Sequence, residues 1–229
     1  MKEFAQLFSS LDETNKTNEK VRVLKQYFSS VADQDKIQTL ALFTGRKPKR
    51  QINATLVRNW AMEMANIPSW LFEESYHVVG DLGETIALLL PKGNGTQNKS
   101  LSEWIAEINS LGSLSEDEKK QWLLASWATM DQQERFVFNK ILTGSFRVGV
   151  SQNLIIKALA EISGLTTQVL THRIMGNWDP ATFSYSQLMQ EEDGSEDISR
   201  PYPFYLAYAI QETSDKAKSA EEISTSLGD

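Results

Sequence analysis

Apolar side chains return every three or four residues along almost the whole chain, whereas the alternation expected of a strand is scarce. One such stripe comprises Leu101, Trp104, Ile105, Ile108 and Leu111. This spacing places apolar groups on one face of an α-helix, and that face is expected to pack against other helices. The sequence therefore predicts an all-α fold, a single multi-helix domain of about a dozen short helices with no sheet.

Polar residues at the expected helix starts favour the same fold class. Ser115 is followed three residues later by Glu118, and Asp131 by Glu134, which predicts a capping box at each start. Asp179-Pro180 predicts a further helix start, because proline at the first helical position loses no hydrogen bond.

The composition allows a sizeable core and excludes several kinds of site. Hydrophobic residues make up 41% of the 229 residues, with six Trp and ten Phe, which argues against wholesale disorder. The absence of cysteine excludes disulfides, Cys-ligated zinc, iron–sulfur clusters and thiol nucleophiles. The apolar runs are too short to span a bilayer, and the chain starts without a signal-peptide pattern. We therefore expect a cytoplasmic protein with no membrane partner.

The charges are unevenly distributed along the chain. A net charge of −7 argues against a nucleic-acid partner at first sight. However, basic side chains outnumber acidic ones in residues 1–60 and 136–178, whereas acidic ones prevail in residues 61–135 and 179–229. The net charge of the whole chain therefore conceals two stretches in which basic side chains prevail.

The last part of the chain has a different composition from the rest. An acidic run, EEDGSEDIS, begins at Glu191 and is typical of a solvated linker. We expect a helical domain over residues 1–190 and an acidic linker over residues 191–229.

A search for catalytic motifs gives no match. The sequence contains no G-x-x-x-x-G-K-[ST] loop, no G-x-G-x-x-G after a strand, no G-x-S-x-G elbow and no H-E-x-x-H pair. His77 is better interpreted as a structural histidine, since no partner for base catalysis is evident. The acids Glu116, Asp117 and Glu118 fall in the first turn of a helix, where they complement its dipole. No catalytic residue and no metal site is predicted.

A cluster of cations is the first indication of a binding function. Arg46, Lys47, Lys49 and Arg50 surround a proline just after a predicted helix, and Arg58 follows in the next one. Such a loop is suited to neutralising phosphates. The alternative is a solvated basic loop.

A glycine-rich turn is the second indication. Gly144 and Gly149 flank Arg147, and Ser151 is predicted to cap a helix from Gln152 to Ser163. Glycine allows a close approach of the backbone, and the free N–H groups of a helix start favour an anion. The alternative is an ordinary joint between two helices.

A third segment contains Gly80, Gly83 and Thr85 before an apolar helix. The glycines are suited either to tight helix packing or to close contact with a sugar–phosphate chain.

Together these segments resemble the N-terminal DNA-binding domain of ATP-dependent DNA ligases, and most closely a bacterial subgroup associated with the response to DNA damage. The matching stretches are LFTGRKPKRQI, WAMEMANIPSWLFEESYHVVGDLGETIALLLP, ILTGSFRVGVSQNLIIKALAEISGL, VLTHRIMGNWDP and RPYPFYLAYAI. They cover most of residues 40–211 in the family's order.

The resemblance implies an all-helical domain that grips nicked duplex DNA. In the family, a nucleotidyltransferase domain and an OB-fold domain follow, and ATP and Mg²⁺ serve the full-length enzyme. The family's K-x-D-G motif, whose lysine is adenylylated, is absent here, because Glu191-Glu192 precede the one Asp193-Gly194. We therefore expect these residues to hold no cofactor and to seal no nick alone.

The resemblance also implies which residues contact DNA, in a bacterial, nucleoid-associated protein of repair, replication or recombination. The expected contacts are Arg46, Lys47, Lys49, Arg50, Arg58, Gly80, Gly83, Thr85, Gly144, Arg147, Gly149, Ser151, Gln152 and Arg173. The alternative function is a helical protein–protein interaction module that does not bind DNA.

Overall fold

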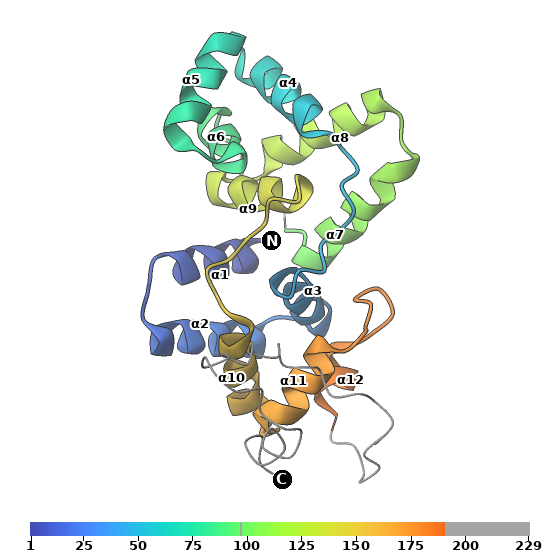
Figure 1. Ribbon diagram of the computed structural model, residues 1–229. Coiled ribbons are helices and arrows are strands. Elements are labelled where there is room, and N and C mark those ends of the chain that lie inside the picture. The colour runs from blue at the N-terminus through green and yellow to red at the C-terminus, as the bar shows by residue number, and fades with distance from the viewer. Residues whose placement is uncertain (97, 191–229) are drawn as a thin grey trace, which may run out of the picture. The chain divides into compact units, whose positions relative to one another are not determined.

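The computed structural model describes residues 1–96 and 98–190, and this part of the chain forms twelve α-helices and one short 3₁₀ helix with no strand (Figure 1). The chain divides into two units, Met1–Asp193 and Gly194–Asp229, and the expected linker lies outside the described residues. The α-helices are α1 (Lys2–Asp12), α2 (Thr17–Ser30), α3 (Asp33–Phe43), α4 (Ala54–Ala65), α5 (Ser69–Val79), α6 (Leu82–Leu89), α7 (Leu101–Ser110), α8 (Glu116–Thr129), α9 (Gln132–Leu142), α10 (Gln152–Ser163), α11 (Thr167–Met175) and α12 (Tyr185–Met189), with η1 (Leu111–Ser113) after α7. The all-α prediction is confirmed.

Both predicted capping boxes are present. At the start of α8, Ser115 N–H donates to Glu118 Oε2 at 2.8 Å, and the Glu118 amide donates back to the Ser115 hydroxyl. At the start of α9, Asp131 and Glu134 make the same reciprocal pair. These motifs are local, and they form where the sequence places them.

The helix start predicted at Asp179-Pro180 is wrong. The Asp179 carboxylate accepts from Ala181 N–H at 2.9 Å, and the Asp179 carbonyl accepts from Thr182 and Phe183 N–H groups. These bonds close a single turn that satisfies the local backbone donors without a continuing helix. The next helix, α12, begins after a cap at Ser184 instead.

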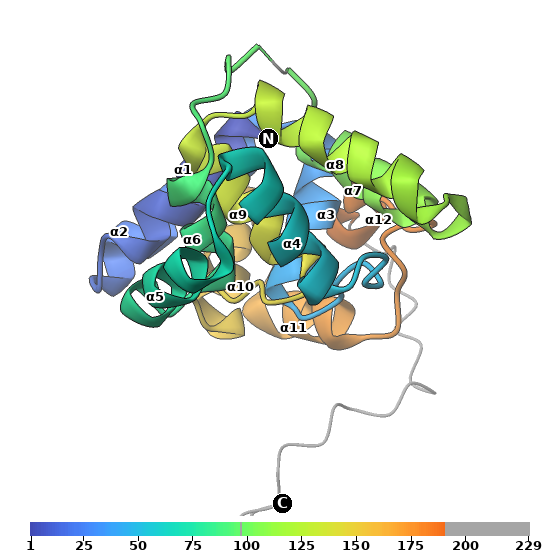
Figure 2. The same cartoon turned by 90° about the horizontal axis from the view of Figure 1, so that it is seen from above.

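Helix α9 lies at the centre of the packing, between α6 and α1 in Figure 1, and α4 lies in front of it in the view of Figure 2. It packs most extensively on α6, and eight of its side chains are buried. Its Asn139 accepts from Trp127 Nε1 of α8 at 2.8 Å and donates to the Gly83 carbonyl of α6 at 3.2 Å. Because every polar atom of this amide is matched inside the core, it fixes how α6 and α8 meet α9.

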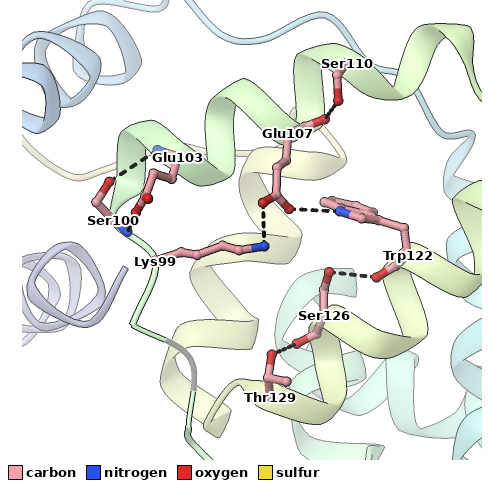
Figure 3. Close-up of polar contacts among 8 residues, drawn as sticks. All are labelled: Lys99, Ser100, Glu103, Glu107, Ser110, Trp122, Ser126 and Thr129. Carbon is pink, nitrogen blue, oxygen red and sulfur yellow. Dashed lines mark hydrogen bonds and ion pairs between the residues drawn. The ribbon is translucent and has the colours of Figure 1, made fainter.

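A polar network joins α7 to α8 (Figure 3). Glu107 on α7 accepts from Trp122 Nε1 on α8 at 3.0 Å and also pairs with Lys99. The Lys99 ammonium lies 4.6 Å from the centroid of the Trp104 ring. The end of the preceding loop is thereby tied to both helices.

Arg135 holds the start of the same loop, which joins α6 to α7. It is 1% exposed, and it donates to the Trp127 carbonyl at 2.7 Å and to the Pro91 carbonyl at 2.6 Å. Gly93 passes so close that a Cβ there would lie 2.0 Å from the Met130 carbonyl oxygen and 2.7 Å from Arg135 Nη2. Only glycine fits at this crossing.

We therefore expect Gly93→Ala to lower the free energy of unfolding by about 1–3 kcal/mol or more, because the added methyl group meets rigid backbone. Gly149→Ala is the matched control, since its Cβ would have only the Lys20 ammonium nearby, at 3.7 Å, and its φ is not positive. Denaturant unfolding of both variants measures the difference. Equal stability of the two variants would contradict the close packing at Gly93.

Candidate nucleic-acid interface

Two loops of the structure begin with the same backbone conformation at a Thr-Gly pair. The basic loop (residues 44–53) follows α3, and the glycine loop (residues 143–151) follows α9 (Figure 1). Each starts with a Thr-Gly pair whose threonine hydroxyl donates to a carbonyl of the last helical turn, at 2.7 Å for Thr44 and 2.8 Å for Thr143. Each glycine then takes a left-handed conformation, with φ of 85° at Gly45 and 71° at Gly144. Both helices therefore stop abruptly and release an extended chain.

Aromatic packing in the core beneath the two loops holds them together. Phe146, in the middle of the glycine loop, is 1% exposed, and its ring centroid lies 6.1 Å from that of Phe43, the last residue of α3. The same ring packs on Phe4 at 5.7 Å and on Phe8 at 5.6 Å, both from α1. The loop backbone is thus anchored in the core while its neighbouring side chains face outward.

Polar contacts join the loops at the surface. Lys47 Nζ donates to the Gly144 carbonyl at 3.2 Å. The Arg50 guanidinium lies 3.7 Å from the position that a Cβ on Gly144 would occupy. Partial burial lowers the pKa of Lys47, and repulsion from Arg147 lowers it further. We call the two loops together the paired-loop surface.

Three cations of the paired-loop surface have unoccupied head groups. Lys49, Arg50 and Arg147 are exposed, and none makes a hydrogen bond or ion pair with the described residues. Like charges gathered without counter-charges repel one another, and a bound anion would relieve this repulsion.

The start of α10 adjoins this surface. The predicted bounds of α10, Gln152–Ser163 with Gly164 as the left-handed end, are confirmed. The predicted capping bond is not formed, because the Ser151 side chain accepts nothing from the first turn. Because no side chain caps this turn and because Ser151 and Gln152 are exposed, the first N–H groups of α10 are accessible to an anion.

Arg46 points the other way, into the fold. Its guanidinium donates to the carbonyls of Ile174 at 3.2 Å and Gly176 at 2.7 Å, and it stacks 4.3 Å from the Trp178 ring centroid. A further bond goes to the Thr44 hydroxyl at 2.8 Å. Burial lowers the pKa of this guanidinium. Arg46 therefore ties the basic loop to the end of α11, and its donors are used internally.

A comparison with protein families decides what kind of domain this is. The family model described as DNA ligase N terminus matches residues 1–160. The chain belongs to the DNA ligase N-terminal family. No curated protein matches it. The match includes both loops and most of α10 and ends before α11.

Two further arginines predicted to contact DNA in this ligase domain, Arg58 and Arg173, also have partners inside it. Arg58 pairs with Glu73 at 2.8 Å and lies 5.6 Å from the Tyr76 ring centroid, which joins α4 to α5. Arg173 donates to the carbonyls of Leu188 at 3.0 Å and Gln190 at 2.5 Å, which joins α11 to the end of α12. These contacts favour structural roles for both.

The Gly80–Thr85 segment of the ligase domain is a packing joint. Thr85 is fully buried and donates to the Asp81 carbonyl at 2.7 Å, so its side chain does not reach the surface as the contact prediction requires. A Cβ on Gly83 would lie 3.2 Å from Lys140 and 3.3 Å from Asn139, which explains the glycine by helix packing. Gly80 ends α5 with φ of 77° and is exposed.

Sequence reasoning did not identify Lys20 as part of this site. Its ammonium donates to the Gly149 carbonyl at 2.6 Å and so joins α2 to the glycine loop. The two residues are 129 positions apart, and no local pattern marks the lysine. Only the packing of α2 on α10 brings them together.

The described residues show neither a membrane span nor a metal cluster. None of their helices combines the length and apolarity needed to cross a bilayer. Their histidine and acidic side chains nowhere gather in threes around a possible metal ion.

We expect Phe146→Ala to destabilise the domain by about 3–5 kcal/mol, because a large buried ring is lost. Phe146→Leu retains much of the apolar volume and should cost less. Thermal or denaturant unfolding measures both. An unchanged midpoint for Phe146→Ala would show that the glycine loop is not anchored by this ring.

Proposed function

We propose that this ligase N-terminal domain binds duplex DNA without sequence preference through the paired-loop surface, and that it holds nicked duplex for the enzyme's catalytic domains. One observation carries the proposal. Two loops from distant parts of the chain meet and present Lys49, Arg50 and Arg147, which have no hydrogen-bond or ion-pair partner among the described residues. Family membership supplies the DNA context.

The chemistry of the surface is suited to phosphates rather than bases. Cations neutralise phosphates and release counterions, which gives affinity that falls steeply with salt. The start of α10 adds backbone N–H donors beside them. Phosphate contacts position a protein without reading sequence, and a ligase must act on nicks in any sequence.

In the full-length enzyme, nucleotidyltransferase and OB-fold domains would follow, and ATP and Mg²⁺ would serve the chemistry there. Residues 191–229 would link the helical domain to them. A place in repair, replication or recombination, in a bacterial and nucleoid-associated enzyme, rests on the sequence resemblance.

One observation favours the alternative of a protein-interaction module. Trp70 on α5 is 66% exposed, Val78 on the same helix is 86% exposed, and Leu88 on α6 is 52% exposed. Exposed apolar groups of this size are typical of binding surfaces for proteins. DNA-binding measurements separate the two functions.

We expect the triple variant Lys49→Gln, Arg50→Gln, Arg147→Gln to bind nicked duplex DNA more weakly. If each side chain contacts one phosphate, the slope of log affinity against log salt should fall by about 2 to 3. Fluorescence anisotropy over a salt series measures both quantities.

The matched control removes three cations elsewhere, as Lys2→Gln, Lys92→Gln, Lys119→Gln. These lie on α1, on the loop before α7 and on α8, and Figure 2 shows that loop (green) at the edge opposite α10 and α11. The control should retain the wild-type slope. If the wild type shows no binding at low salt, or both triples behave alike, the paired-loop surface is not the DNA site.

A second expectation concerns catalysis. Because the 229 residues contain no K-x-D-G motif, incubation with labelled ATP and Mg²⁺ should leave no covalent AMP on the chain. Gel electrophoresis with autoradiography measures this, with a full ligase as the positive control. A labelled band at the mass of this chain would contradict the expectation.

A further inference from the structure

A second basic face lies where α2 packs along α10. It consists of Arg22, Lys25 and Lys157 along the groove, Lys20 beside the glycine loop, and Lys16 near Glu19 at the start of α2. A shallow groove of about 280 Å³ runs between the two helices, lined by Asn18, Val21, Arg22, Lys25, Lys157 and Glu161. This face was not among the contacts predicted from sequence.

Positive charge exceeds negative charge on this face. Glu19 pairs with Arg22 at 2.5 Å, and Glu161 pairs with Lys25 at 2.8 Å. The bond from Lys25 lowers the pKa of Glu161, and the charge of Lys157 lowers it further. Lys16 and Lys157 themselves make no ion pair among the described residues. On the α10 wall of the groove, Lys157 therefore remains without an ion pair among the described residues, whereas the α2 wall carries Arg22 and Lys25, each in an exposed ion pair.

The ion pairs already present do not close the face to another anion. All four partners are substantially exposed, with 40% or more of each side chain in solvent. Exposed pairs of this kind contribute little to stability. Arg22 and Lys25 can therefore exchange a carboxylate for a phosphate at small cost.

The face is continuous with the paired-loop surface. Lys20 of α2 donates to the Gly149 carbonyl of the glycine loop at 2.6 Å, so the two surfaces meet at this bond. Helix α10 begins at the paired-loop surface and carries Lys157 five residues after Gln152, which is about 8 Å along the helix axis. That length corresponds to roughly two base-pair steps of duplex DNA.

We propose that the α2–α10 groove extends the DNA path, so that a phosphate backbone leaving the paired-loop surface passes Lys20 and continues between Arg22 and Lys157. The occupant is the sugar–phosphate backbone of a duplex arm beside the nick. This inference rests on the proposed DNA-binding function. It adds a second contact region beside the first.

The test uses the triple variant Lys16→Gln, Arg22→Gln, Lys157→Gln, in which Lys20 is left in place so that the glycine loop keeps its support. The probe is a nicked DNA dumbbell closed by hairpins, with a stem of about three helical turns. Anisotropy titrations over a salt series give the affinity and the salt slope of each variant.

The groove variant should bind several-fold more weakly than the wild type, with a slope reduced by about 2 to 3. The paired-loop triple variant should also lose affinity, whereas the Lys2, Lys92, Lys119 control should keep the wild-type affinity.

Three outcomes separate the two proposals. If the wild type does not bind the dumbbell, the proposed function itself fails. If the wild type and the paired-loop triple behave as expected but the groove variant equals the wild type, the groove is not part of the path. If the Lys2, Lys92, Lys119 control weakens binding as much as the groove variant does, a general loss of charge explains the effect and the inference is overturned.

Discussion

The packing of Phe146 against Phe43 and the α1 rings is the interaction on which the proposed interface depends. Phe43 directly precedes one Thr-Gly turn, and Phe146 follows the other by two residues. Their contact therefore fixes the spacing of the two loops. A loop that carries several like charges would otherwise move away from its neighbour. Buried apolar area, rather than any polar contact, therefore supplies the free energy that keeps the cations of both loops on one surface.

The cations predicted to contact DNA differ in their partners. Arg46, Arg58 and Arg173 donate to carbonyls or a carboxylate inside the domain. Their planar guanidinium groups can satisfy several acceptors at once, which suits arginine to joining separate elements. Lys49, Arg50 and Arg147 are exposed and have no such acceptors in the part of the chain that the structure describes. The same residue types thus hold the scaffold in one place and offer charge to a ligand in another.

The sequence predicted what depends on neighbouring residues. The bounds of α10 and the capping boxes at Ser115 and Asp131 are confirmed because the residues that form them lie within a few positions. The inward turn of Arg46 could not be predicted, since its acceptors lie about 130 residues away and α11 must first be packed. Thr85 illustrates the same limit: its spacing after Gly83 is compatible with a ligand, but the packing of α6 among its neighbouring helices buries it. The contacts themselves remain a prediction.

The net charge of the chain does not indicate what this domain binds, because folding brings the two basic stretches together. The basic stretches meet in space, since α2 packs on α10 and α1 on α9. The acidic stretch from residue 61 to residue 135 includes α5 to α8, of which α6 packs on α9 and α7 on α3. A phosphate near the surface responds to charges within about a Debye length, roughly 8–10 Å in physiological salt, rather than to the sum over the chain. A protein with a net charge of −7 can therefore attract DNA to one surface while its other faces repel it, and this difference would orient the approach.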